Sequence, residues 1–219
     1  SSSKFNRAKQ ALYANLPYYV QLEHVLHRTL LSAEGVAHPL LEKRSPASRF
    51  VLCLITSDTG LCSTYNHMAI RMAEEFIEKR GKENVRLISI GLEGRDHFRK
   101  TGISIISSYA ELHGKFSENI LDRIAKDLTD IFLSRSADEV YIANIHFSGT
   151  LSHKPVLQKL LCIDIAEKAS IEYIAEPNIE AVLDRLIPRY VREKLRHTLL
   201  DAFTSEHAAR MVAMKMATD

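Results

Sequence analysis

The stretch that decides the fold is FVLCLITSDTGLCSTYN, residues 50–66. It opens with a run of apolar and β-branched residues, which is typical of a buried strand. A polar turn with Gly60 and Cys62 ends the run, and an amphipathic helix pattern then covers residues 65–80 until Gly81 ends it. A strand, a tight turn and a helix in this order predict the first unit of an α/β domain.

The same alternation continues through the middle of the chain. A short helix is predicted within EGRDHFRKTG (93–102), and a longer one from Ser117 onward. Strands are predicted for the apolar runs at 50–57, 85–91, 103–109, 139–147 and 156–163. Strands separated by helices form a mostly parallel sheet that is covered on both faces, and the last two strands suggest an added antiparallel hairpin. We therefore predict an α/β domain over residues 49–170.

Two long amphipathic segments, 1–34 and 178–219, flank this domain. Each has a seam residue every three or four positions, and such a heptad seam calls for a long partner helix. The second seam is mostly small, so we expect the two helices to approach each other closely along it. The seam residues are Phe5, Ala8, Leu12, Asn15, Tyr19, Leu22 and Leu26 in the first segment, and Val191, Leu195, Thr198, Ala202, Ser205, Ala209, Val212 and Met216 in the second.

The ends of these helices also carry signals. We expect the first helix to stop at Gly35, and Pro188 either to lie near the first turn of the second helix or to kink it. The alternative is that the two segments are unrelated amphipathic helices packed on the central domain. Each segment is about thirty residues long, or roughly 45 Å as a helix, which is longer than a small domain needs and favours the paired arrangement.

Composition narrows the class of protein. At 219 residues the chain can bury the core of one full α/β domain without stabilising disulfides or metals. Its three cysteines, Cys53, Cys62 and Cys162, contain no C-x-x-C pair, which indicates reduced and buried thiols. The net charge of +2 implies no nucleic-acid partner, but the positive excess lies on the terminal segments and suggests that they face an anionic surface. No apolar run approaches the ~18 residues that span a bilayer, so we expect a soluble or peripherally attached protein.

The turn after the first strand lies where an α/β enzyme would hold a phosphate or a nucleophile. A phosphate cradle needs several glycines, and this turn has only Gly60. A catalytic Cys62 would need a positioned base, but spacing singles out none of His67, His97 and His146. Histidine pairs elsewhere lack a third metal ligand at a suitable spacing. We therefore predict no catalytic, cofactor-binding or metal-binding residues.

Several segments nevertheless resemble one family. TSDTGLCSTYN (56–66) resembles the S-D-R-G-L-C-G-G-x-N turn of the γ subunit of F-type ATP synthases. SEHAARMVAMKMATD (205–219) is similar, almost letter for letter, to the S-E-x-x-A-R-M-x-A-M-x-x-A-T-D segment of that family. Further similar segments, in the family's order, are SSKFNRAKQA (2–11), GLEGRDHFRKTG (91–102) and EPNIEAVLDRLIPRYV (176–191). The resemblance thus covers nearly the whole chain.

The turn departs from the family pattern at three positions. Thr59 replaces the usual Arg, and Ser63 and Thr64 stand where Gly-Gly or Gly-Ala is usual. These residues are small, so the tight turn can still close.

The resemblance implies a rotor shaft. In this family a Rossmann-like, mostly parallel sheet domain is inserted between two long terminal helices, which form an antiparallel, left-handed coiled coil inside a ring of α and β subunits. It further implies that the ε subunit and the c-subunit ring bind at the base, and that catalysis and nucleotides belong to β. We expect a peripheral location on the cytoplasmic face of the bacterial inner membrane, or on the matrix face of the mitochondrial inner membrane. Family members continue beyond both ends of this sequence, so we expect the shaft to be truncated here.

The matching C-terminal segment carries the candidate contact residues. We expect Glu206, Arg210 and Lys215 to lie near the α and β subunits or to brace the coiled coil. Met211 and Met214 are either adaptable sliding contacts or ordinary core residues.

The turn carries the candidate structural residues. We expect Gly60 to supply backbone freedom, Asp58 or Asn66 to cap the following helix, and Cys62 to be buried.

Two rival functions remain. The chain could be a small α/β nucleotide-binding enzyme with helical extensions, and measurable affinity for ATP or a dinucleotide would favour this. It could also be a coiled-coil scaffold without rotary function, and failure to join an α/β subunit ring would favour that.

Overall fold

The computed structural model describes residues 2–33, 37–164 and 178–218. Its centre is a five-stranded sheet with the order β3-β2-β1-β4-β5. The strands are β1 (Phe50–Ile55), β2 (Val85–Ile90), β3 (Ser104–Tyr109), β4 (Glu139–Gly149) and β5 (Ser152–Leu161). The first four are parallel to one another, and β5 is antiparallel to β4. The mostly parallel sheet and the added hairpin are therefore confirmed.

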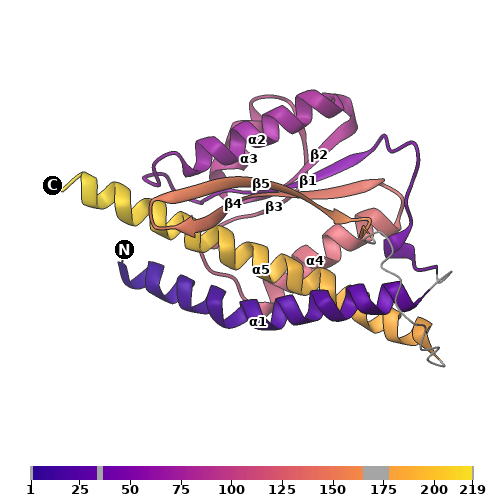
Figure 1. Cartoon of the computed structure of the whole chain (residues 1–219). Coiled ribbons are helices and arrows are strands. Elements are labelled where there is room, and N and C mark those ends of the chain that lie inside the picture. The colour runs from indigo at the N-terminus through magenta and orange to yellow at the C-terminus, as the bar shows by residue number, and fades with distance from the viewer. Residues whose placement is uncertain (1, 34–36, 165–177, 219) are drawn as a thin grey trace.

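Helices cover both faces of this sheet (Figure 1). The helices α2 (Tyr65–Arg80) and α3 (Leu92–Arg99) lie on one face, and α4 (Glu118–Leu133) lies on the other. Along β1, Leu52 and Leu54 pack into the cluster that contains α2, whereas Val51, Cys53 and Ile55 pack into the cluster that contains α4. A strand buried on both faces has no polar side, which explains the unbroken apolar run in the sequence.

Two short 3-10 helices, η1 (Pro39–Leu41) and η2 (Lys82–Asn84), complete the secondary structure of this region. The predicted helix over 65–80 is confirmed, and Gly81 with φ of 88° ends it. The hairpin was predicted less well, since β5 begins at Ser152 rather than Val156. A tight connection extends the pairing through polar residues near the hairpin tip, where apolar patterning carries no signal.

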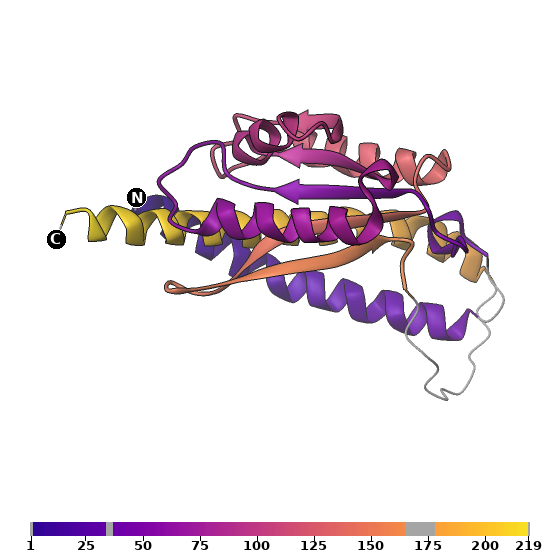
Figure 2. The same cartoon turned by 90° about the horizontal axis from the view of Figure 1, so that it is seen from above.

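The two terminal helices, α1 (Ser2–Ser32) and α5 (Ile179–Met216), pack against each other. Tyr19 stacks on His197 with ring centroids 4.5 Å apart, and Ser2 donates a hydrogen bond to the Met211 sulfur. Early residues of α1 therefore meet late residues of α5, so the pair is antiparallel, as both Figure 1 and Figure 2 show. Gly35, the predicted end of the first helix, lies outside the described residues, and α1 ends before it at Ser32.

Prolines lie inside both long helices. Pro188 was predicted near the first turn or at a kink, but α5 begins at Ile179, so Pro188 lies in the third turn of a helix that continues past it. Pro17 lies in the middle of α1. A proline in a helix interior removes one backbone hydrogen bond, and packing of these helices on each other and on the sheet offsets that loss.

The direction of the small seam on α5 was predicted wrongly. Tyr65 of α2 donates to the Ala202 carbonyl, His153 of β5 is 2.8 Å from the Ser205 hydroxyl, and Ala209 packs in a cluster with α2 and β1. Ser205 and Ala209 therefore face the α/β domain, and the backbone of Ala202 is bound by it. Residues 201–209 are all buried, because the domain covers one side of α5 while α1 covers another.

Two further predictions concern the whole chain. The three cysteines are free thiols and all are buried. The helices found in residues 2–33, 37–164 and 178–218 include none that is both long and apolar enough to cross a membrane. The predicted domain limits 1–34, 49–170 and 178–219 stay predictions, and residues 1, 34, 165–170 and 219 within them are not described.

Candidate functional site

The site that an α/β sheet of this topology offers lies between β1 and β4. Successive strands run from β1 outward to β3, and the chain then returns to the other side of β1. Such a reversal opens a crevice at the carboxyl ends of the strands, where this class of fold usually binds ligands. In this protein the helix α5 runs alongside the β4-β5 hairpin, and its Arg210 reaches the turn that follows β1 at the carboxyl end of the sheet.

Asp201 anchors α5 to β4. Its carboxylate accepts hydrogen bonds from the Phe147 amide at 3.0 Å and from Asn144 Nδ2 at 3.1 Å. His146 Nδ1 lies 3.0 Å from the same carboxylate. Asp201 is buried, so three partners compensate for the loss of water around its charge.

Two further polar contacts extend this row along α5. Gln158 of β5 donates to the Thr198 hydroxyl at 3.2 Å, and His153 pairs with Ser205. Positions 198, 201 and 205 follow the spacing of one helix face, so one row of polar groups meets the β4-β5 hairpin. This row fixes both the rotation of α5 and its position along its axis, because each group has a directional partner.

Asp58 in the turn after β1 does not cap α2. Its carboxylate accepts from the Glu111 amide at 2.9 Å and the His113 amide at 2.7 Å, so it ties the end of β1 to the loop after β3. The prediction of a capping role is therefore wrong for Asp58. The sequence did not indicate these partners because they are distant along the chain: Asp58 and Glu111 are 53 positions apart.

Asn66 also serves the turn rather than the helix end. Its Oδ1 accepts from the Ser57 amide, and its Nδ2 donates to the Ser57 hydroxyl at 2.7 Å and to the Cys62 sulfur at 3.2 Å. The N-cap of α2 is Thr64, whose side chain makes no capping hydrogen bond. Cys62 is buried, and burial raises the pKa of its thiol, which makes it a poor nucleophile.

Gly60 was expected to supply the backbone freedom of the turn, and this expectation is wrong. The left-handed conformations belong to Leu61 with φ of 59° and Ser63 with φ of 53°. A Cβ on Gly60 would meet only Glu93 Oε1, at 3.9 Å. The glycine that the turn requires is Gly91, with φ of 93°, where a Cβ would lie 2.2 Å from the Thr56 carbonyl oxygen.

Glu206 and Arg210 join the turn to the C-terminal helix. Arg210 Nη1 lies 2.6 Å from Glu206 Oε1, and its Nη2 donates to the Thr59 carbonyl at 3.0 Å and approaches the Thr59 hydroxyl at 3.3 Å. Burial raises the pKa of Glu206, and the Arg210 charge opposes that rise. We call Asp58, Thr59, Glu206 and Arg210 the turn–helix junction. The prediction treated the turn and the helix as separate sites, and the structure brings them together.

The remaining candidate contact residues lie outside this junction. Met211 packs beside Phe5 and Phe147 where α1 meets the hairpin. Met214 and Lys215 are exposed near the end of α5, and their predicted roles stay predictions.

Sequence reasoning missed Asp201 and Tyr65. Tyr65 is fully buried and donates its hydroxyl to the Ala202 carbonyl at 3.1 Å. A signal for Asp201 did exist, because Thr198, Asp201 and Ser205 form a polar row at helical spacing within an otherwise apolar helix.

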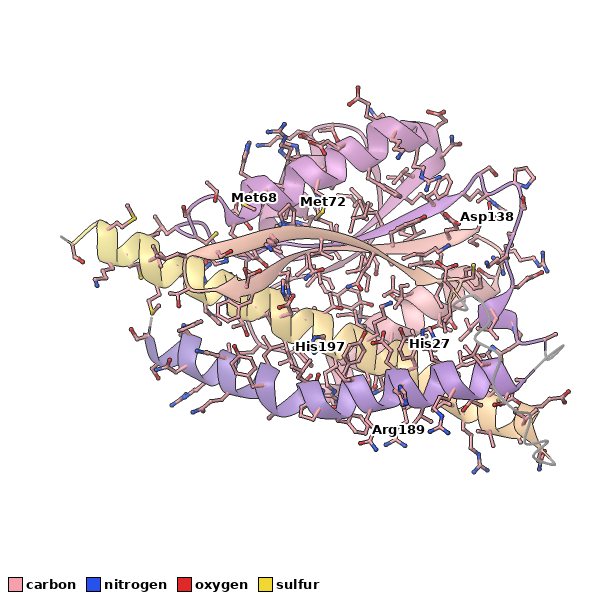
Figure 3. The ribbon with its side chains drawn as sticks, viewed as in Figure 1. His27, Met68, Met72, Asp138, Arg189 and His197 are labelled. Carbon is pink, nitrogen blue, oxygen red and sulfur yellow. The ribbon has the colours of Figure 1, made fainter. Side chains whose placement is uncertain are left out.

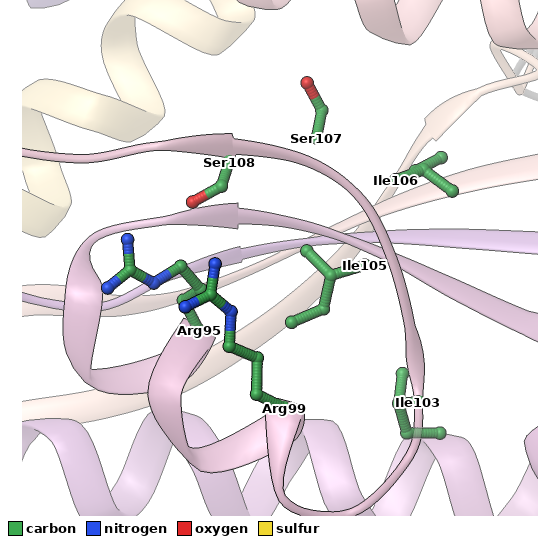
Figure 4. A pocket seen from close by; sticks show the side chains of 7 residues that line it. All are labelled: Arg95, Arg99, Ile103, Ile105, Ile106, Ser107 and Ser108. Carbon is green, nitrogen blue, oxygen red and sulfur yellow. The ribbon is translucent and has the colours of Figure 1, made fainter.

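A shallow hollow along β3 offers another place for a ligand (Figure 4). Arg95 and Arg99 of α3 extend toward Ser108, while Ile106 and Ser107 lie on the other side of the strand. Arg95 Nε lies 2.8 Å from Asp96, so its charge is already paired. The hollow has no glycine-rich loop at its rim, and among the described residues no cluster of acidic, His and Cys side chains could hold a metal.

These features define a class of protein: an α/β domain with a long helix of its own chain fixed along its sheet and tied to the turn after β1. The family model described as ATP synthase matches residues 1–219. The ATP synthase gamma chain of Desulfitobacterium hafniense is 37% identical over 220 residues, which cover 100% of this chain and 78% of that protein. The ATP synthase gamma chain of Anaeromyxobacter sp. (strain Fw109-5) is also 37% identical, over 227 residues with the same coverage. The chain belongs to the ATP synthase gamma chain family.

Solved structures agree with this fold. The central stalk and c-ring structure of the Tetrahymena thermophila mitochondrial ATP synthase contains a chain that matches with a TM-score of 0.68 and 20% identity, covering 100% of this chain and 99% of that one. A chain of the Euglena gracilis mitochondrial ATP synthase matches with a TM-score of 0.61 and 13% identity, covering 99% and 83%. The fold of an α/β domain between two paired terminal helices is thus confirmed.

Proposed function

We propose that this chain is the central-stalk rotor subunit of an F-type ATP synthase. It couples ion flow at a ring of c subunits to conformational cycling of the catalytic β subunits, for ATP synthesis or hydrolysis. The observation that carries the proposal is the fixed position of α5 along the β4-β5 hairpin and at the turn after β1. Asp201 and Arg210 hold this helix to the sheet domain through directional hydrogen bonds, so a torque applied to the domain passes to the helix pair.

Partners follow from this role. The helix pair enters a ring of α and β subunits, and the α/β domain binds the ε subunit and the c-subunit ring. Related proteins support these assignments, since the Tetrahymena thermophila structure comprises a central stalk and a c ring. An asymmetric shaft acts by making different contacts with each β subunit, because a partner shifts an equilibrium only through differential contacts.

The chain itself is a non-catalytic subunit. The turn–helix junction takes up the place where an α/β enzyme would bind its nucleotide, and burial raises the pKa of Cys62 and so disfavours its reactive thiolate. As part of the complex, the chain is peripheral, on the cytoplasmic face of a bacterial inner membrane or the matrix face of a mitochondrial one.

Reconstitution tests the proposal. The complete gene product is combined with purified α and β subunits, and complex formation and ATP hydrolysis are followed. We expect one copy per ring and a rise in hydrolysis. A label on Ser104→Cys, an exposed position of β3, should rotate in one direction when the ring is immobilised and ATP is added.

Each way in which this reconstitution can fail supports one of the two rival functions. Hydrolysis without rotation of the label would indicate a scaffold. Absence of a complex, together with saturable binding of ATP to the chain alone, would indicate a nucleotide-binding enzyme.

A further inference from the structure

A groove lies where α1, α5 and the loop before α4 meet. Its volume is about 480 Å³, and this is the size of a site for a small organic ligand. We call it the three-segment groove, because its lining comes from residues 4–11 of α1, residues 114–118, and residues 196–207 of α5.

The floor of the groove is apolar and partly aromatic. Phe116 and Phe203 form a tilted pair with ring centroids 6.2 Å apart, and Leu200 lies beside them. On the α1 side the lining residues are Ala8 and Ala11, whose short side chains leave the space above the rings open. A flat aromatic ring fits such a floor by stacking or edge contact.

The rim of the groove is positively charged. Lys4, Arg7 and Lys115 line it, and no ion pair joins any of them to an acidic group of residues 2–33, 37–164 or 178–218. Glu118 is the acidic lining residue, and its carboxylate is bound by Arg196 at 2.5 and 2.7 Å and by Arg192 at 2.6 Å. Glu118 is therefore already neutralised, and the rim keeps an excess of positive charge.

His207 lies within this positively charged region. Its ring packs directly on Gly114, where a Cβ would lie 2.3 Å from Nε2. Burial lowers the pKa of His207, and the charges of Arg210, Lys4 and Lys115 lower it further. Two of these cations, Lys4 and Lys115, also line the groove.

We propose that the three-segment groove binds a small aromatic anion, in which a flat ring carries a carboxylate or sulfonate. The ring lies over Phe116 and Phe203, and the acid group lies among Lys4, Arg7 and Lys115. Such a ligand touches both terminal helices and the α/β domain at once. It therefore binds the packed arrangement of the three segments in preference to any arrangement in which they separate.

The probe for the test is 1-anilinonaphthalene-8-sulfonate, whose fluorescence rises in an apolar site. It is titrated into the folded chain beside N-phenyl-1-naphthylamine, a neutral molecule of nearly the same shape. We expect saturable binding of the sulfonate at one site, with affinity at least about tenfold above that of the neutral molecule, as expected for charge-assisted hydrogen bonds. Raising the salt concentration should weaken binding of the sulfonate and leave binding of the neutral molecule unchanged.

Variants locate the site. The double variant Arg7→Gln with Lys115→Gln should weaken sulfonate binding about tenfold, and Ala11→Trp should abolish it by filling the groove. Arg28→Gln removes an exposed cation of the same helix outside the groove and should leave binding unchanged. Circular dichroism checks that each variant is folded.

Three outcomes would overturn the proposal. The first is equal affinity for the charged and neutral molecules, which indicates general apolar adsorption. The second is unchanged affinity in both groove variants. The third is absence of sulfonate binding while an Asp- and Glu-rich peptide binds, which would make the occupant a protein segment.

Discussion

The two sides of α5 are built differently. Toward the α/β domain, α5 presents polar groups with directional partners, such as the buried Asp201 to the Phe147 amide and the partly buried Arg210 to the Thr59 carbonyl. Toward α1, which His197 faces in Figure 3, it presents stacked rings and apolar contacts with fewer hydrogen bonds, as where His197 stacks on Tyr19 and Tyr190 donates to Glu23. Apolar contact is not directional, whereas hydrogen bonds fix position. This difference therefore predicts that α5 stays with the domain more firmly than with α1.

The largest effect is expected from Asp201→Ala. The variant leaves the Phe147 amide and Asn144 without their acceptor in a buried place, so we expect a loss of about 3 kcal/mol in the free energy of unfolding. Urea denaturation measures it. The matched change on the other side is Asn15→Ala, which removes the 3.2 Å contact with His197 and should cost less than about 1 kcal/mol. Equal losses would remove the contrast between the two sides.

The next effect concerns Leu12→Ala on α1. Leu12 is buried where α1 meets Ala208 and Phe147, so its truncation should cost about 2–3 kcal/mol. We expect hydrogen exchange to accelerate along α1 while the amides of β1 and β4 stay protected, because α1 can detach without breaking the polar row. Uniform acceleration in β4 would mean that the two helices open together with the sheet. Leu16→Ala, at a more exposed position of the same helix, is the control.

A smaller effect is expected from Tyr65→Phe. The variant removes one buried hydroxyl that donates to the Ala202 carbonyl and keeps the ring, so we expect a loss of about 1 kcal/mol. Thermal unfolding of the variant beside Tyr13→Phe, at an exposed position of α1, measures the difference. A change in Tyr65→Phe no larger than in the control would show that this hydrogen bond does not hold α5.

The smallest effect is a pH dependence of stability at the contact between Glu118 of α4 and two arginines of α5. Hydrogen bonds from Arg196 and Arg192 lower the pKa of Glu118 from 4.5 to about 2. Because the folded-state pKa is depressed, this stabilisation is present above pH 4.5 and is lost as the pH falls toward 2. Glu118→Gln should flatten that part of the stability profile measured by urea denaturation between pH 2 and 6.

The control for this profile is Glu75→Gln. Glu75 pairs with Arg71 on the surface of α2, and both side chains are largely exposed, so we expect an unchanged profile. If the pH profile of stability is as steep in Glu118→Gln as in the unchanged protein, the role assigned to the ion pairs of Glu118 is wrong.

Much of the fold was predictable from local patterns. The run at 50–57 and the helix at 65–80 were recognised because apolar continuity, helical periodicity and Gly81 act within a few residues. The site was less predictable. Arg210 meets Thr59 across 151 residues of sequence, and Asp58 meets the Glu111 and His113 amides rather than its own helix. No local pattern encodes such partners.

The sequence by itself determined the elements, the order in which strands and helices alternate, and the family to which the chain belongs. Only the tertiary structure decided which way α5 faces. A helix enclosed on two sides has no polar stripe, so the heptad seam through Ala202, Ser205 and Ala209 could be read toward α1 although it faces the sheet domain. The hydrogen-bond partners of Asp201, Ser205 and Arg210 remove that ambiguity, because directional groups must find their partners at one rotation of the helix.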